Sequence, residues 1–166
     1  DASAGQAAEA TAALLAAVLA EVAPTVLDAV RTTLAGTDDP AVARALGAWL
    51  GSDDTGLRNA VVVALQTMPT GVAGVVTDLL ASPDARVRTL TVMVLSTLPH
   101  PRVGQWLALV AEHDTDANIV AAAVDAAQLL DSDLAADLAA TGAARFPTNP
   151  YLGFLASVAT TAAGGR

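Results

Sequence analysis

Apolar residues recur along most of the chain at helical spacing, in stretches separated by short polar turns. The stretch that follows Asp39-Pro40, for example, carries Val42, Leu46, Trp49 and Leu50, which share one helix face. No segment alternates between apolar and polar residues over a useful length, so the pattern predicts helices and no strands. Residues 61–63 are all valine, but they lie within a helical stripe, and we expect them to be helical.

The helical stretches come in pairs that repeat along the chain. The first helices begin at nearly equal intervals, at Val42, Val72, Val103 and Leu134. The second helices open at similar intervals, at Asp54, Asp84, Asp116 and Asn149. A repeat of roughly 30 residues is typical of a stacked solenoid. We therefore predict an all-α fold, a right-handed superhelical α-solenoid of about five antiparallel helix pairs.

We expect one domain over residues 1–166, built from successive pairs. An N-terminal pair (1–37, with helices over 4–22 and 25–34) is followed by repeats 38–68, 69–98 and 99–130, a C-terminal capping pair (131–163) and a tail (164–166). Within the second repeat, the spacing predicts one helix through Val72 and Leu80, with Thr70 as its cap. In the last helix, Leu152, Leu155 and Val158 form the predicted packing stripe.

Aspartates stand at most of the predicted helix starts. Asp there accepts hydrogen bonds from free backbone amides, so we interpret the acidic pairs 38–39, 53–54 and 131/133 as caps rather than as acid–base groups. The cluster Glu112-His113-Asp114 has ligands that suit a divalent cation such as zinc, but its place at a helix end favours a turn followed by a cap. We predict no catalytic residue, no cofactor and no metal site.

The opening Asp-x-x-aliphatic-Arg, at Asp54 to Arg58 and Asp84 to Arg88, resembles the second helix of HEAT repeats. The short unit is similar to the HEAT-like subtype associated with bilin lyases, and the resemblance covers about residues 39–158. It implies a hydrogen-bonded ladder along the array, formed by Asp54, Arg58, Asp84, Arg88 and Asp116. Val120 replaces the arginine in the third copy, and Asn149 and Gly153 replace both ladder residues in the fourth.

Tetratricopeptide repeats are the alternative family. The segment from Arg145 to Pro150 resembles a junction between two such repeats. Their period is nearer ~34 residues, with a Trp, Gly and Tyr signature that the rest of this chain lacks.

Composition and charge restrict the partners. The net charge is −9, and the eight basic residues are all arginine. An acidic surface disfavours nucleic acid and anionic membranes, and it favours a basic protein partner. No stretch is long enough to cross a membrane. There is no cysteine, so the compartment stays open, with the cytoplasm favoured. Because the chain begins with Asp1, we expect a processed product or a fragment.

The predicted function is a non-enzymatic scaffold that docks a partner protein or peptide. Arg86 points to a different face from Arg88, so it is the better ligand candidate, while the ladder would engage Arg58 and Arg88. Trp49 and Trp106 are expected in the core, and an exposed tryptophan would instead mark an interaction site. Tyr151 and Phe154 are expected to cap the array or to form a docking patch. The candidate partner-binding residues are Arg58, Arg86, Arg88, Asn118 and Trp106.

Two alternatives come from other classes. One is an enzyme-associated protein like the bilin lyases, and the other is a structural segment of a larger assembly. The sequence does not fix the oligomeric state.

Overall fold

The computed structural model describes residues 38–164, with side chains described for 38–159. This part of the chain is all-helical, with nine α-helices, one 3-10 helix and no strand. Its residues fall into two compact units, which we call unit 1 (described residues 38–100) and unit 2 (described residues 101–164). The expected helices at 4–22 and 25–34 lie outside the described residues. None of the described helices is long and apolar enough to cross a bilayer.

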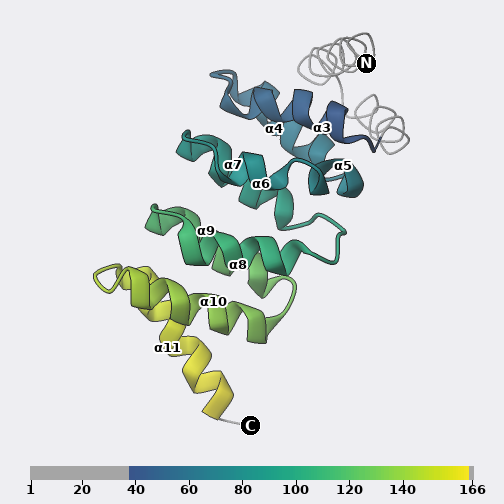
Figure 1. Cartoon of the computed structure of the whole chain (residues 1–166). Helices are drawn as coiled ribbons and strands as arrows, with labels where there is room; N and C mark the ends of the chain where they lie inside the picture. Colours follow the sequence, from purple (N-terminus) through teal and green to yellow (C-terminus); the bar gives the residue numbers. More distant parts are fainter. Residues whose placement is uncertain (1–37, 165–166) are drawn as a thin grey trace. The chain divides into compact units, whose positions relative to one another are not determined.

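Unit 1 holds five α-helices and the 3-10 helix among its described residues (Figure 1). The elements in chain order are α3 (Pro40–Gly47), η1 (Ala48–Gly51), α4 (Thr55–Leu65), α5 (Pro69–Ala73), α6 (Val76–Leu80) and α7 (Ala85–Leu95). Helix α3 packs against α5, α4 and η1, and α7 packs against α4, α6 and η1. The core contains Leu46, Leu50, Val61, Leu65, Met68, Val72 and Leu95, all at or near complete burial.

Unit 2 holds four helices among its described residues, α8 (Val103–His113), α9 (Ala117–Gln128), α10 (Ser132–Arg145) and α11 (Pro150–Gly164). Each packs against its neighbour in sequence, and α8 also contacts α10. Its core is built around Trp106, Leu107, Ile119, Val124 and Leu152. Small residues complete it, because Ala111, Ala123, Ala127 and Ala135 are also fully buried and allow the helices to approach closely.

Five of the predicted caps are confirmed. Each of the aspartates at a predicted helix start accepts a hydrogen bond from a backbone amide in the first turn of its helix: Asp39, Asp54, Asp84, Asp116 and Asp131. Pro40 takes the first position of α3, where its missing amide proton costs nothing. Residues 61–63 are helical within α4, as predicted. Local capping chemistry therefore determines where most helices begin.

The prediction of one helix through Val72 and Leu80 was wrong. The chain forms two short helices, α5 and α6, with a break at Gly74 and Val75. A Cβ atom on Gly74 would lie 2.8 Å from the Pro40 Cβ, so this position lies directly against the start of α3. Thr70 is not the cap either, because α5 begins at Pro69 with Met68 before it.

The two tryptophans have different environments. Trp106 is 1% exposed, so its prediction as a core residue is confirmed. Trp49 lies in η1 and is 39% exposed, so the same prediction for Trp49 was wrong. The helix ends in a 3-10 turn there, which changes the direction of the side chain relative to a continuous α-helix.

Candidate functional site

The turns that precede the second helices of the pairs share one construction. In unit 1, the Ser52 hydroxyl accepts a hydrogen bond from the Asp54 amide, and the Ser82 hydroxyl does the same for Asp84. The guanidinium of Arg58 donates to the Ser52 carbonyl oxygen at 2.6 Å, and Arg88 donates to the Ser82 carbonyl oxygen at 3.0 Å. Both turns thus have the same side-chain bonds, and they lie one repeat apart in the sequence.

Unit 2 builds the corresponding turn with different side chains. Asp114 takes the serine's place and accepts from the Asp116 amide at 2.9 Å. The position of the arginine is held by Val120, which is fully buried. A guanidinium still reaches the turn, because Arg145 at the end of α10 donates to the Asp114 carbonyl oxygen and to that of Ala111, both at 2.7 Å. The sequence pattern did not reveal this role for Arg145.

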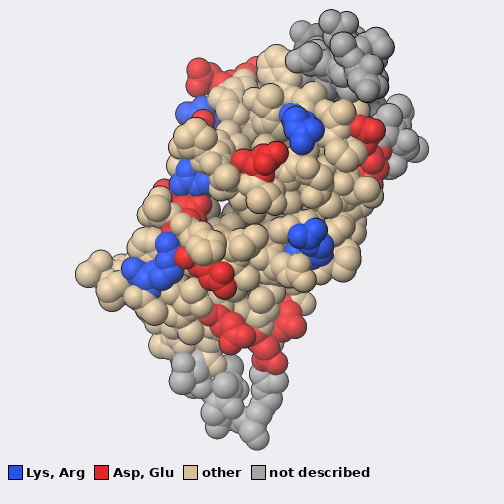
Figure 2. All heavy atoms as spheres, in the orientation of Figure 1, with Lys and Arg blue, Asp and Glu red and all other residues tan. Residues whose placement is uncertain are grey.

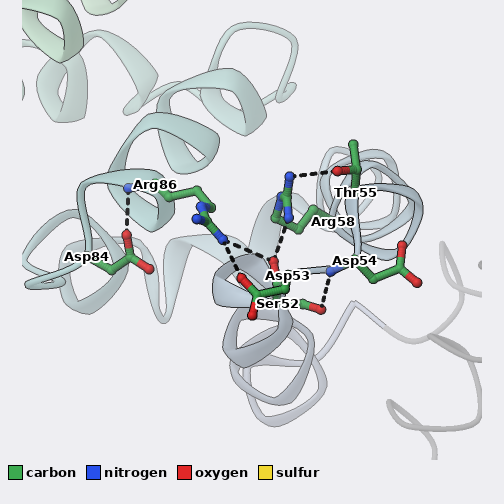
Figure 3. Close-up of polar contacts among 7 residues, drawn as sticks. All are labelled: Ser52, Asp53, Asp54, Thr55, Arg58, Asp84 and Arg86. Carbon is green, nitrogen blue, oxygen red and sulfur yellow. Dashed lines mark hydrogen bonds and ion pairs between the residues drawn. The ribbon is translucent and has the colours of Figure 1, made fainter.

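Arg86 connects two consecutive turns of unit 1 (Figure 3). Its guanidinium lies 3.2 Å from a carboxylate oxygen of Asp53 and 3.4 Å from the Ser52 carbonyl oxygen. Both side chains are exposed, and an exposed ion pair of this kind contributes little to stability, typically ~0–1 kcal/mol. This side-chain contact joins one helical pair to the preceding one, and we had not predicted a partner for Arg86 within the chain.

The ladder implied by the HEAT resemblance stays a prediction. The Asp54 carboxylate accepts from the Leu57 amide of its own helix, and the Asp84 carboxylate accepts from the Arg86 amide. Arg58 also donates to the Thr55 hydroxyl, so its observed contacts lie within its own turn (Figure 3).

The candidate partner-binding residues therefore differ in what they offer. Arg58 and Arg88 are partly buried and hold their own turns, and Arg86 is exposed but paired with Asp53. Asn118 is exposed in the first turn of α9. The Trp106 ring is buried in unit 2, with the Arg102 guanidinium 5.3 Å from its centroid, and its role in partner binding stays a prediction.

The acidic cluster at the end of α8 does not converge on one point. Asp114 is 9% exposed and bonded to the Asp116 amide, while His113 and Glu112 are exposed, with Nε2 and Oε2 3.7 Å apart. Across residues 38–159, no three His, Cys, Asp or Glu side chains are arranged to hold a metal ion.

Asp38 has a structural role outside its own helix. Its two carboxylate oxygens accept hydrogen bonds from the amides of Thr70 and Gly71 at the start of α5. Partial burial opposes ionisation, but the hydrogen bonds from Gly71 and Thr70, together with the nearby His100, lower the pKa of Asp38 below its ordinary 3.8. Asp38 thus fastens the short helix α5 to the segment before α3.

Apolar side chains are exposed along α11. Tyr151, Phe154 and Val158 follow one another at helical spacing and are 45%, 59% and 49% exposed. We call these three residues the C-terminal stripe. The prediction that Val158 packs inward with Leu152 was wrong, because Leu152 is fully buried on another face of the same helix.

The Tyr151 hydroxyl joins this stripe to α9. It donates to the carboxylate of Asp125, at 2.9 Å and 3.2 Å from the two oxygens. This hydrogen bond, followed by partial burial and the charge of Asp125, raises the pKa of Tyr151 above its ordinary 10.0.

Comparisons of the chain with protein-family models, with curated proteins and with solved structures found no match.

Proposed function

We propose that this chain is a non-enzymatic α-solenoid of HEAT-like helical pairs that docks a partner protein or peptide on its surface. The observation that carries the proposal is the repeated turn, in which a side chain caps the turn and a guanidinium binds the carbonyl oxygen of Ser52, Ser82 or Asp114. Helical repeats that are built alike stack into arrays, and the extended surfaces of such arrays serve mainly in binding.

The charge distribution supports a basic partner. The chain carries 17 acidic and eight basic residues. Three of the arginines, Arg58, Arg88 and Arg145, donate to backbone carbonyl groups, while Arg44 and Arg86 lie within ion-pair distance of aspartates. Much of the positive charge is therefore engaged in contacts within the chain. The net negative charge of the protein attracts cationic partners.

The test is affinity capture from an extract of the source organism, with the captured proteins identified by mass spectrometry. Capture at roughly 0.1 M and roughly 1 M salt compares a Debye length of about 10 Å with one of about 3 Å. We expect a stoichiometric basic partner whose yield falls at high salt. A stoichiometric partner that is insensitive to salt would contradict the electrostatic part of the proposal.

Analytical ultracentrifugation of the purified chain completes the test. If no partner is captured and the chain instead self-associates, the scaffold proposal is wrong and a structural segment of a larger assembly takes its place.

A further inference from the structure

The last two second helices can be aligned through their caps. Asp116 accepts from the Asn118 amide at the start of α9, and Asn149 accepts from the amides of Tyr151 and Leu152 at the start of α11. Superposing Asn149 on Asp116 pairs residues 150–161 of α11 with residues 117–128 of α9. This alignment places the C-terminal stripe, Tyr151, Phe154 and Val158, at the positions of Asn118, Ala121 and Asp125.

On α9, one residue of the corresponding side, Asp125, contacts Tyr151 of the following helix pair. Asn118 and Asp125 are exposed in α9, although Ala121 between them is buried. Polar residues suit such a side, and α11 replaces them with two aromatic rings and a valine. Exposed apolar residues that form a continuous row mark interaction sites more often than single ones do.

Another side of α9 packs against α10, the first helix of the next pair. Val120 and Val124 are fully buried, and a Cβ atom on Gly142 of α10 would lie 2.9 Å from the Val120 side chain. The corresponding residues of α11 are Gly153, around which a Cβ would meet nothing within 4 Å, and Ser157, which is exposed. The side of α11 that would stack against a further helix pair is therefore small and polar.

Unit 2, which carries the stripe, is acidic. The described residues of unit 2 contain seven carboxylates and two arginines, Arg102 and Arg145. Arg145 is bound to two carbonyl oxygens, and Arg102 lies over Trp106. Acidic side chains gather over the α10 region in Figure 2. Asp125 lies at the edge of the stripe itself, in contact with Tyr151.

We propose that the C-terminal stripe docks one amphipathic helix of a partner protein. The apolar face of that helix covers Phe154, Val158 and the Tyr151 ring, and an arginine or lysine beside its apolar face pairs with Asp125. Charge complementarity selects the basic flank, because Asp125 keeps unused acceptor capacity after it binds the Tyr151 hydroxyl. This inference rests on the proposed function and specifies the binding site and the chemistry of the partner.

The test is selection from a display library of helical peptides with randomised apolar and flanking positions, against the intact chain. We expect enriched peptides to carry an apolar stripe flanked by Arg or Lys. The double variant Phe154→Gln/Val158→Gln should weaken their binding at least tenfold, and Asp125→Asn should weaken it and reduce its salt dependence. Leu129→Gln is the matched control, since Leu129 is a 72% exposed leucine of the same unit, and it should leave binding unchanged. Circular dichroism checks that every variant remains folded.

Three results of the peptide selection, and one of sedimentation, would overturn the inference. The first is an absence of enriched peptides, and the second is enrichment of peptides without a basic flank. The third is equal binding to the double variant, which would place docking elsewhere and leave the proposed function standing. Sedimentation distinguishes a second copy, since a dimer that becomes a monomer in the double variant would make this chain its own partner. Failure of the proposed function is read separately, from the capture experiment.

Discussion

Arg145 donates to the carbonyl oxygen of Asp114, which lies in the turn after α8, well before α10 in the sequence. Its second bond, to the Ala111 carbonyl oxygen, ties the end of α10 to the last turn of α8. In unit 1 the corresponding carbonyl groups are bound by an arginine of the adjacent helix, so unit 2 reaches the same arrangement from a more distant part of the chain.

Arg145→Ala should destabilise the protein by about 2 kcal/mol, because two hydrogen bonds from a charged donor to partly buried carbonyl groups are lost. The measurement is urea-induced unfolding followed by circular dichroism. Arg44→Ala is the control. The Arg44–Asp78 pair is exposed and 3.8 Å long, so its loss should change stability little. Equal effects of the two substitutions would show that the bonds of Arg145 add nothing beyond a surface contact.

Gly142 and Gly153 provide a matched pair of helical glycines. Alanine at Gly142 would meet the stiff side chain of Val120 at 2.9 Å, whereas alanine at Gly153 meets nothing within 4 Å. Both substitutions gain the same helix propensity, roughly 1 kcal/mol. We expect Gly153→Ala to raise the free energy of unfolding. The Gly142→Ala variant should be less stable than the Gly153→Ala variant by about 1–3 kcal/mol, the usual cost of overpacking. Thermal unfolding of both variants measures the difference, and equal melting temperatures would contradict this packing.

Tyr151 is the only tyrosine of the chain, so tyrosinate absorbance reports on it alone. Its pKa is raised by the bond to Asp125, and titration should therefore give a midpoint above 10.0. Asp125→Asn should return the midpoint toward that value. The stabilisation from this bond is present below pH 10.0 and is lost as the pH rises through the folded-state pKa. A midpoint that is the same with and without the Asp125 charge would show that the contact is absent in solution.

Asp38 should make stability depend on pH in the acid range. Its folded-state pKa lies below the unfolded value of 3.8, so its contribution is present above pH 3.8 and is lost as the pH falls through the lower, folded-state value. The unfolding free energies of the wild type and of Asp38→Asn, measured by urea titration from neutral to acid pH, should converge as the carboxylate is protonated. A constant difference between them across this range would rule out the ionised carboxylate as the group that holds α5.

Sequence reasoning succeeded where the structure is determined locally. A cap such as Asp54 or Asp131 needs only its own helix, so position in the chain was enough to assign it. Sequence reasoning failed where the local structure depends on a contact with a residue far away in the sequence. The break between α5 and α6 lies where Gly74 approaches Pro40, which belongs to the preceding helical pair.

The candidate site shows the same limit. Arg86 was correctly placed on a different face from Arg88, but its partner Asp53 belongs to the preceding turn and could not be identified from spacing alone. The exposure of Val158 could have been predicted from the sequence, because the alignment of Asn149 with Asp116 places Val158 at the position of the polar residue Asp125. Trp49 had no such signal, since its exposure depends on the 3-10 turn of η1.

The division of one expected helix into α5 and α6 has a consequence for local unfolding in the described part of unit 1. Each is five residues long, which is a little more than one turn and too short to stay helical without tertiary contacts. Their amide protons should therefore exchange with solvent through local openings that leave α4 and α7 intact. Among the described residues of unit 1, we therefore expect residues 69–80, between α4 and α7, to open most readily and to give a protease or a chaperone access there.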